Sequence, residues 1–419
     1  MLPTPFKYAL IATTIIGCAP AIAAAHDGVH LSGFGNVSVI HSGTKDFGYI
    51  YDLTKEGVFD TWSLKTGSSI GLQMNTSLTD NLDAVIQGVV QDRINNDLNK
   101  SITWAFLRYK ASPDLTIRVG RIATPLYMLS EYRDVGFAYL WTKPITDFYS
   151  NIPVTTLDGG DIAYTIPFMD GMLETRFYAG QSEVAIDNVT NTTDVTLSPL
   201  FGTRLTYYVD RWTFSGSAAT VKNKKGEPAA QLSALFSQDP SIFTAWPSLQ
   251  STLNDFQFVD TRLYYYSLGA HYETGDWNVQ SELSYSDAEW PFFPDLAAGY
   301  ISVGRTFDSS TVYGFASKAK SVGDLYTVEA PPAISLLAPQ IASAYQTLKG
   351  VVSARAINQE TLGFGVRYDI NTQLSLKGQI ERTWLLDSKF GAWSYSLEGI
   401  NAPVPDHIDT ISISLSFVF

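Results

Sequence analysis

The sequence predicts an all-β fold, a transmembrane antiparallel β-barrel of 16 strands with long extracellular loops. Three observations support it: an N-terminal segment with the pattern of an export signal, ~10-residue segments of alternating polarity, and connections that are short and long in strict turn. After the N-terminal segment, no window approaches the ~18 consecutive apolar residues that a spanning helix needs. A closed barrel is the remaining membrane fold, because it pairs every backbone group inside the bilayer.

The composition favours such a barrel over a helical bundle or a disordered chain. Of 419 residues, 45% are hydrophobic and 13% aromatic, and only 16% are charged, against about a quarter in ordinary soluble proteins. The formal net charge is −13. Nucleic acid is excluded as a partner, because binding phosphates requires a basic surface.

The first 25 residues have the three parts of a cleavable signal peptide. Lys7 supplies the positive charge, residues 8–18 are apolar, and small alanines follow at the spacing of a cleavage site. We expect cleavage after Ala25, with Ala23 as the alternative position.

A second interpretation of this segment stays open. The stretch Ile15-Ile16-Gly17-Cys18 resembles a bacterial lipoprotein cleavage box, and Cys18 is the only cysteine of the chain. Under the first interpretation, residues 26–419 form a single barrel domain that has no cysteine and therefore no disulfide in an oxidising compartment.

The predicted strands alternate apolar and polar residues over lengths that suit a tilted crossing of the bilayer. They cover residues 28–40, 66–78, 82–93, 101–110, 115–121, 160–167, 171–181, 201–209, 212–221, 261–273, 277–287, 297–307, 310–318, 355–370, 372–384 and 408–419. Short turns rich in Asp, Asn, Gly, Ser or Pro alternate with long connections at 41–65, 94–100, 122–159, 182–200, 222–260, 288–296, 319–354 and 385–407. A sandwich gives no reason for this alternation, whereas a barrel has one rim on each side of the membrane.

The alternation also predicts which side chains face lipid. On 82–93, Ile86 and Val90 face outward and Gln87 faces the lumen. In the next hairpin, the register places Arg108 opposite Arg118, both inside. A charge on the lipid face at mid-bilayer costs roughly 2–4 kcal/mol. This assignment of outward and inward residues is therefore strongly preferred.

The stretch ISISLSFVF, Ile411–Phe419, is the closing strand of the predicted barrel. Its apolar residues occupy every odd position and serines occupy three of the even ones. Pairing it with the first strand, 28–40, removes both free edges of the sheet.

The connection at about 122–159 is predicted to be a constriction loop folded into the lumen. It is long, and its aromatic content is too high for a solvated loop. Its candidate functional residues are Glu131, Tyr132, Arg133, Asp134 and Asp147. Inward folding would bring its carboxylates near a wall of inward arginines, namely Arg93, Arg108, Arg118, Arg176 and Arg204.

Two alternatives to this constriction stay open. The arginines form only interior ion pairs that stiffen the barrel, or the loop folds outward as a subunit latch or surface cap. The connections 222–260 and 319–354 contain short stretches of helical periodicity, which either narrow the outer mouth or bind a partner.

The signal peptide, the sixteen strands, the long third external loop and the terminal Phe strand together resemble the general bacterial porins of Gram-negative outer membranes. The segment RVGRIATPLYMLSEYRDVGFAYLWTKP, Arg118–Pro144, is similar to a porin-like family of gammaproteobacteria. The PEFGG motif that enterobacterial porins have in this loop is missing here.

This resemblance implies a location in the outer membrane, with its lipid and lipopolysaccharide as neighbours, and a homotrimer. It also implies that the third loop lies in the lumen. The terminal aromatic would act in barrel closure and in recognition by the barrel-assembly machinery, a role that falls to Phe419, with Phe417 beside it on the same face.

The leading functional hypothesis is a water-filled channel for passive diffusion of small polar solutes and ions, without cofactor, metal or catalysis. A substrate-specific channel for small anions such as carboxylates, or for sugars, is the alternative. A barrel enzyme or a surface structural protein is more remote, because no catalytic motif accompanies the five histidines and no metal-ligand cluster is visible.

Overall fold

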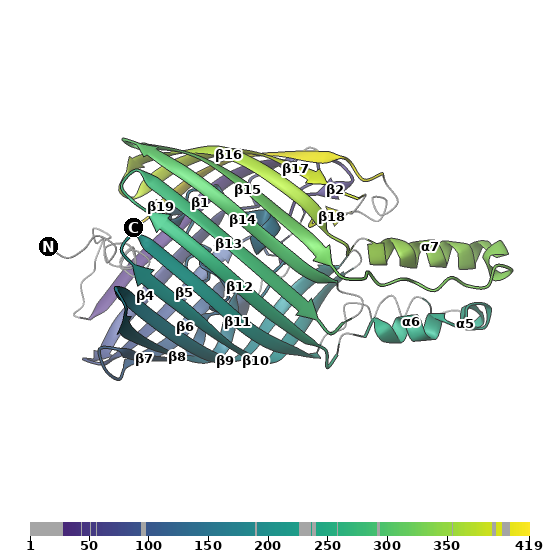
Figure 1. Ribbon diagram of the computed structural model, residues 1–419, viewed down its shortest axis with the longest axis horizontal. Helices are drawn as coiled ribbons and strands as arrows, with labels where there is room; N and C mark the ends of the chain where they lie inside the picture. Colours follow the sequence, from purple (N-terminus) through teal and green to yellow (C-terminus); the bar gives the residue numbers. More distant parts are fainter. Residues whose placement is uncertain are drawn as a thin grey trace.

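Sixteen long antiparallel strands close into a barrel in the described part of the chain (Figure 1). The computed structural model describes residues 28–42, 44–50, 52–55, 57–93, 98–188, 191–225, 236, 240–257, 259–290, 294–353, 355–387, 391–395 and 403–419, with only the backbone for 186–188 and 191–193. The predicted signal peptide lies outside these residues.

Each long strand pairs with its neighbour in sequence. The strands are β1 (Val29–Ser42), β4 (Ser69–Thr79), β5 (Leu82–Gln91), β6 (Ile102–Lys110), β7 (Leu115–Ala123), β8 (Thr156–Phe168), β9 (Gly171–Asn188), β10 (Asn191–Val209), β11 (Trp212–Lys225), β12 (Arg262–Glu273), β13 (Trp277–Ala288), β14 (Asp295–Phe307), β15 (Ser310–Val322), β16 (Asn358–Asn371), β17 (Leu374–Leu385) and β19 (His407–Val418). Three short strands, β2 (Phe47–Gly48), β3 (Trp62–Ser63) and β18 (Ser394–Tyr395), lie in the long connections. The predicted barrel of 16 strands is confirmed.

The terminal strand closes the barrel on the first strand, as predicted. β19 pairs antiparallel with β1, with Gly35 opposite Phe417. The Gly33 N–H donates to the Phe419 carbonyl at 2.8 Å, and the Phe419 N–H donates back at 2.9 Å. The rings of Phe417 and Phe419 lie over Gly35 and Gly33, where a Cβ would collide with them.

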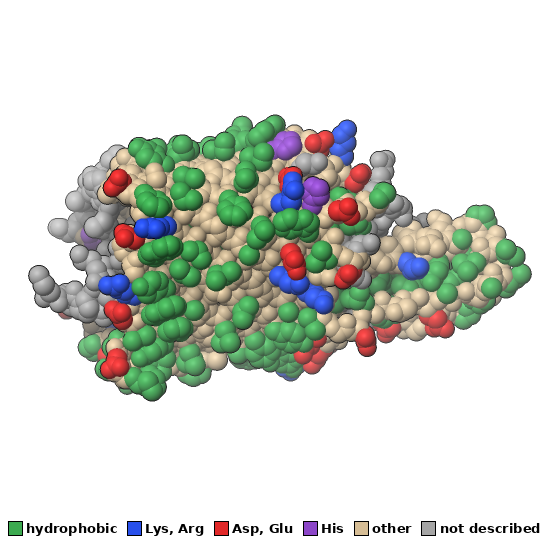
Figure 2. Space-filling model, turned by 45° about the horizontal axis from the view of Figure 1, so that its top comes forward, with side chains coloured by type: hydrophobic (Ala, Val, Ile, Leu, Met, Phe, Trp, Pro, Cys, Tyr) green, Lys and Arg blue, Asp and Glu red, His purple; other side chains and the backbone are tan. Residues whose placement is uncertain are grey.

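The predicted faces are also confirmed. Ile86 and Val90 are 47% and 66% exposed on the outer surface, whereas Gln87 is buried inside, and Arg108 pairs with Arg118 in the ladder. Figure 2 shows apolar side chains over the middle of the barrel and charged side chains gathered toward its two ends. This distribution fits a hydrocarbon band between two polar rims.

Several predicted boundaries were wrong. β8 begins at Thr156 and not at residue 160, and β11 and β15 end at Lys225 and Val322 and not at 221 and 318. The connection 182–200 was expected to be a loop, but β9 continues to Asn188 and β10 begins at Asn191, so most of it is a paired hairpin. The strand expected from residue 355 begins only at Asn358. Tertiary pairing extends the hairpin of β9 and β10 beyond its alternating pattern, whereas residues 355–357 lie between the end of α7 (Pro339–Ser353) and the start of β16.

Helices project from the rim that carries the long connections (Figure 1). They are α5 (Ser241–Ala245), α6 (Leu249–Asp255) and α7 (Pro339–Ser353), with the 3-10 turn η2 (Ser335–Leu337) before α7. The Trp246 and Tyr345 rings contact each other at 5.6 Å, which joins the two predicted helical stretches into one projection that extends away from the barrel. None of the helices in the described ranges is both long enough and apolar enough to cross a membrane.

Candidate functional site

Residues 124–155, between β7 and β8, run through the interior of the barrel, and we call this segment the lumen loop. It contains α3 (Thr146–Tyr149) and the 3-10 turn η1 (Gly136–Ala138). Most of its aromatic side chains are buried: Trp141 and Phe148 contact Tyr300 of β14 at 5.5 and 5.3 Å between ring centroids. Burial of these rings stabilises the inward conformation, because each removes a large apolar area from water.

Glu131 lies between two arginines of the barrel wall. Its carboxylate accepts from Arg118 of β7 at 3.0 Å and from Arg176 of β9 at 2.6 Å. Desolvation opposes ionisation of Glu131, but Arg176 and Arg118 outweigh it and hold its pKa below the usual range. A third wall arginine, Arg204 of β10, donates to the Tyr127 carbonyl at 2.9 Å.

The other two candidate wall arginines do not meet the lumen loop's carboxylates. Arg108 makes its ion pair with Asp83 of β5 at 2.9 Å, close to the short-turn rim. Arg93 lies just beyond β5 and donates to the Val89 carbonyl at 3.0 Å. Arg108 has a nearer partner on the neighbouring strand and Arg93 on the strand that it follows, and the inward position of a residue does not by itself reveal such partners.

Three further candidates lie in the same part of the lumen loop. Arg133 donates to Asp52 at 2.5 Å and to the Tyr127 hydroxyl at 2.9 Å, so it ties the first long connection to the lumen loop. Asp134 forms no ion pair or hydrogen bond with the described residues. Tyr132 packs against the interior hydrophobic cluster.

Opposite the arginines, β17 holds the loop through buried charges. Lys377 is only 1% exposed, and its ammonium donates to the carbonyls of Gly136, Tyr139 and Trp141 at 2.5, 2.5 and 2.9 Å. Three donors thereby satisfy three carbonyls that would otherwise lie unpaired inside the barrel. Lys143 of the loop is ion-paired with Glu381, which lies four residues after Lys377 on β17.

Asp147 is the last candidate, and it lies on this side of the lumen. Its carboxylate accepts from Ser317 of β15 at 2.8 Å and from Gln359 of β16 at 2.5 Å. Burial raises the pKa of Asp147 to about 6, although these hydrogen bonds lower it in part. Nearby, Glu282 of β13 accepts from the Met128 N–H at 2.8 Å and from the Tyr149 hydroxyl.

The sequence interpretation missed Lys377, Glu381 and Glu282. Each occupies an inward position of a predicted strand, which is the same signal that selected the arginines. Their partners in the lumen loop are backbone groups, the Tyr149 hydroxyl and the ammonium of Lys143, and no periodicity of the strands predicts those contacts.

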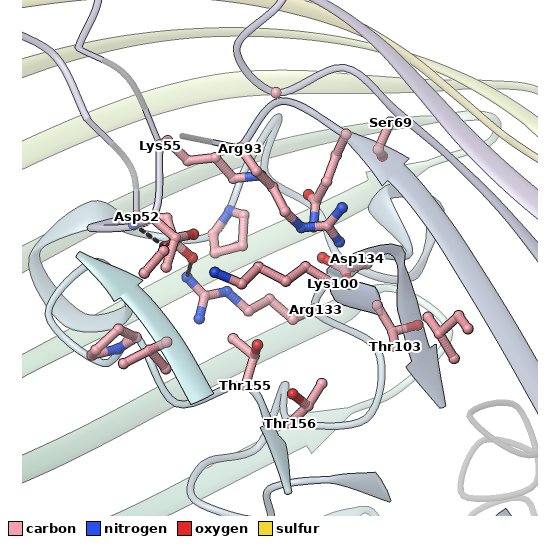
Figure 3. A pocket seen from close by; sticks show the side chains of 18 of the residues that line it. Asp52, Lys55, Ser69, Arg93, Lys100, Thr103, Arg133, Asp134, Thr155 and Thr156 are labelled. Carbon is pink, nitrogen blue, oxygen red and sulfur yellow. Dashed lines mark hydrogen bonds and ion pairs between the residues drawn. The ribbon is translucent and has the colours of Figure 1, made fainter. Parts of the chain in front are cut away.

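Three adjacent cavities lie between the lumen loop and β1, β4, β5 and β6. The outer cavity has a volume of about 120 Å³ and is lined by charged residues that include Lys55, Arg93, Lys100, Arg133 and Asp134 (Figure 3). The middle cavity, which we call the neck, has a volume of about 30 Å³. The inner cavity has a volume of about 40 Å³.

Neighbouring cavities share lining residues. The outer cavity and the neck share Thr103, Arg133, Asp134, Thr155 and Thr156. The neck and the inner cavity share Gln87, Trp104, Glu131 and Val135. The three cavities therefore form one row from the long-loop rim toward the short-turn rim, displaced to one side of the barrel.

The chemistry of this row is polar. Gln87 donates to Gln73 at 2.9 Å and accepts from Thr103 at 2.8 Å, which gives the wall a ladder of neutral hydrogen-bonding groups. Across from it, the lumen loop contributes Glu131 and Asp134. In the described ranges, no group of three His, Cys, Asp or Glu residues is placed to hold a metal ion.

The chain is similar to solved outer-membrane barrels over nearly its whole length. In vitro folded OmpT of Vibrio cholerae, described as a trimer form, has a TM-score of 0.50 and 10% identity, covering 94% of this chain and 100% of its own. OmpF of Salmonella typhi has a TM-score of 0.52 and 13% identity, covering 93% of this chain and 97% of its own. The outer-membrane channel DcaP of Acinetobacter baumannii has 0.52 and 14%, also covering 93% and 97%. At these identities the likeness concerns the fold.

No curated protein matches the chain in sequence. The family model of Gram-negative porins, however, matches residues 12–384. This match covers most of the chain and agrees with the closed barrel, the polar lumen and the apolar outer band. The chain belongs to the Gram-negative porin family, and it forms a channel for passive diffusion across the outer membrane of a Gram-negative bacterium.

Proposed function

We propose that solutes cross this porin through the row of three cavities between the lumen loop and β4–β6, and that the neck limits their size. The shared lining residues carry this proposal. The rest of the lumen is filled by the loop and its buried aromatic side chains. Pore radius and lining charge determine what such a channel passes, so the residues of the neck set its selectivity.

The neck favours small polar solutes and, among ions, cations. Glu131 is neutralised by Arg118 and Arg176. Asp134 has no ion pair among the described residues, and its carboxylate lines the neck, where Lys55 and Arg133 oppose its charge only in part. Trp104 and Gln87 narrow the opposite side with neutral groups.

Cysteine substitution tests this path, because Cys18 falls within the predicted signal peptide and leaves the barrel without a thiol. Thr103→Cys places a thiol on β6 beside the neck, and Thr361→Cys places one on β16 behind the loop. The two threonines have similar exposure, 7% and 5%. We expect a bulky thiol reagent to reduce the single-channel current of Thr103→Cys and to leave Thr361→Cys unchanged. Equal effects on both variants would contradict the displaced path.

A channel specific for small anions is the second candidate, and one observation favours it. Lys55, Lys100 and Arg133 direct their charged ends toward the middle of the outer cavity (Figure 3), and Arg93 lines the same space. Several of these cations already have partners, such as Asp194 for Lys100 at 2.6 Å. Flux of a dicarboxylate that saturates at low concentration would support this candidate, whereas flux proportional to concentration would support open diffusion.

Processing and assembly complete the proposal. The signal peptide is removed after Ala25, and the barrel-assembly machinery recognises the terminal strand through Phe419, with Phe417 beside it. The mature chain forms a homotrimer, which the trimer form of the Vibrio cholerae protein supports. The channel acts without cofactor or catalysis. Conductance steps that occur in groups of three would support the trimer, and single independent steps would contradict it.

A further inference from the structure

The outer cavity, with a volume of about 120 Å³, is lined by charged side chains of both signs (Figure 3). Four of its cations have a carboxylate partner: Arg133 pairs with Asp52, Arg121 with Asp158, Lys100 with Asp194 and Lys143 with Glu381. A solute would have to displace a carboxylate to bind any of these four cations.

Two groups of opposite sign in the same lining are open to a solute. Arg93 donates to the Val89 carbonyl at 3.0 Å, which engages one of its five N–H groups. Among the residues that the structure describes, neither Arg93 nor Asp134 has an ion pair. Both act electrostatically on Lys55, so both lie near its ammonium.

The last two charged residues of the lining are placed differently. Lys55 is only 4% exposed, and its ammonium donates to the Asp92 carbonyl at 2.5 Å. Glu183 is exposed on β9 and acts electrostatically on Arg121. Arg93 and Asp134 are therefore the two groups through which the cavity can hold a charged part of a solute.

The formal charges of the cavity balance. The described lining contributes six cations and four carboxylates, and Asp194 and Glu381 add two carboxylates from outside it. An ion of either sign is attracted by one of the two open groups and repelled by the other. A zwitterion is attracted by both, because it carries a carboxylate and an ammonium.

We propose that the outer cavity binds small zwitterionic solutes such as amino acids, with the solute carboxylate on Arg93 and its ammonium on Asp134. A guanidinium holds a carboxylate through two parallel hydrogen bonds, and charge-assisted hydrogen bonds are stronger than neutral ones. The inference rests on the proposed path, whose outer end is this cavity. The neck that follows is smaller, about 30 Å³, so a solute is held in the outer cavity before it passes.

Planar-bilayer recordings in potassium chloride at pH 7 test the site with three solutes of similar size. Alanine has both charged groups, propionate lacks the ammonium, and isopropylamine, protonated at this pH, lacks the carboxylate. Each solute is added until its reduction of the single-channel current saturates. We expect the half-saturating concentration of alanine to be roughly tenfold lower than that of either other solute, since only alanine makes both contacts.

Arg93→Gln and Asp134→Asn each remove one of the two charges. Each should raise the half-saturating concentration of alanine roughly tenfold, whereas Arg93→Lys, which keeps the charge, should raise it less. Arg211→Gln and Asp80→Asn are the matched controls, because both residues are exposed in turns at the short-turn rim. Both controls should leave the binding of alanine unchanged.

Equal half-saturating concentrations of alanine and propionate would overturn the proposal, and so would shifts in the controls as large as those in the cavity variants. The thiol reagent on Thr103→Cys separates this inference from the proposed path. A blocked Thr103→Cys current without any preference for alanine overturns the zwitterion site and leaves the path. A preference for alanine that depends on Arg93 and Asp134, in a channel whose Thr103→Cys current is not blocked, supports the site and contradicts the path.

Discussion

The two sides of the lumen use their inward residues in opposite ways. On β4, β5 and β6, neutral groups such as Gln73, Gln87 and Thr103 bond to one another and leave empty space in front of them. On β13 to β17, inward side chains such as Glu282 and Lys377 bond to the lumen loop itself. On the proposed path, one side conducts and the other holds the loop. The comparison teaches that an inward charge in a barrel is not by itself evidence for contact with solute.

The largest effect is expected from removing the buried ammonium of the holding side. Lys377→Met leaves the carbonyls of Gly136, Tyr139 and Trp141 without a donor. We expect a loss of at least about 3 kcal/mol in the free energy of unfolding, since each of the three unsatisfied carbonyls costs about 1–3 kcal/mol. Release of the loop should also raise single-channel conductance. The unfolding temperature on gels and planar-bilayer recordings measure the two effects.

The exposed Lys318 provides the control for that substitution. Its side chain is 52% exposed and paired with Glu360, so Lys318→Met should change the unfolding temperature little. A small effect of Lys377→Met would show that the loop is not held by β17.

A smaller effect concerns the pH dependence of the holding side. The pKa of Asp147 is raised to about 6 from 3.8, so its uncharged form is favoured in the folded protein. The contribution of protonated Asp147 to the stability of the folded protein is present in full below its pKa in the unfolded chain. This contribution is lost as pH rises through about 6. We expect the porin to be less stable at pH 8 than at pH 5 by about 1–2 kcal/mol from this group.

Asp147→Asn tests that assignment because the amide does not titrate. Urea unfolding at pH 5 and pH 8 should show a smaller pH difference in the variant than in the unsubstituted chain. An identical difference in both proteins would assign the pH dependence to another group.

The conducting side should respond mainly in selectivity. Glu131→Gln removes the carboxylate shared by Arg118 and Arg176. Because this carboxylate is 37% exposed at its side chain, we expect a stability loss of only about 1 kcal/mol. Arg118 keeps Asp161 and Arg176 keeps Glu174 as partners, but the loss of one negative charge should shift the reversal potential under a salt gradient toward anions. Asp83→Asn, which affects Arg108 near the short-turn rim, is the control and should shift it less.

The smallest change in stability is expected at Asp134. Because it has no ion pair among the described residues, Asp134→Asn should change the free energy of unfolding by less than about 0.5 kcal/mol. It should nevertheless lower the preference for cations, as read from the reversal potential. An unchanged reversal potential would remove Asp134 from the conducting path.

The sequence predicts the barrel well because each strand carries its own evidence. Alternating polarity and turn residues are local, so they fix the strands, the faces and the pairing of Arg108 with Arg118. The hairpin formed by the ends of β9 and β10, beyond residue 182, was not predicted. Its two strands stay paired where the alternation of apolar and polar residues fades. The extended state there depends on the partner strand and not on local pattern.

The interior was less predictable because its contacts join residues that are far apart in sequence. Glu131 pairs with Arg118 and Arg176. The opposite charges of the loop and of the inward wall residues were enough to predict this contact. The three carbonyls on Lys377 lie more than 230 positions away from it. A backbone carbonyl has no sequence signature, so only the folded loop reveals these partners.

The lumen loop has a mechanical consequence. It connects Arg118 and Arg176 on one side of the tube to Lys377 and Glu381 on the other through short polar contacts. A hollow cylinder flattens easily under sideways load, whereas one with a rigid strut across its diameter keeps a round cross-section. We therefore expect lateral pressure in the membrane to change the width of this pore very little.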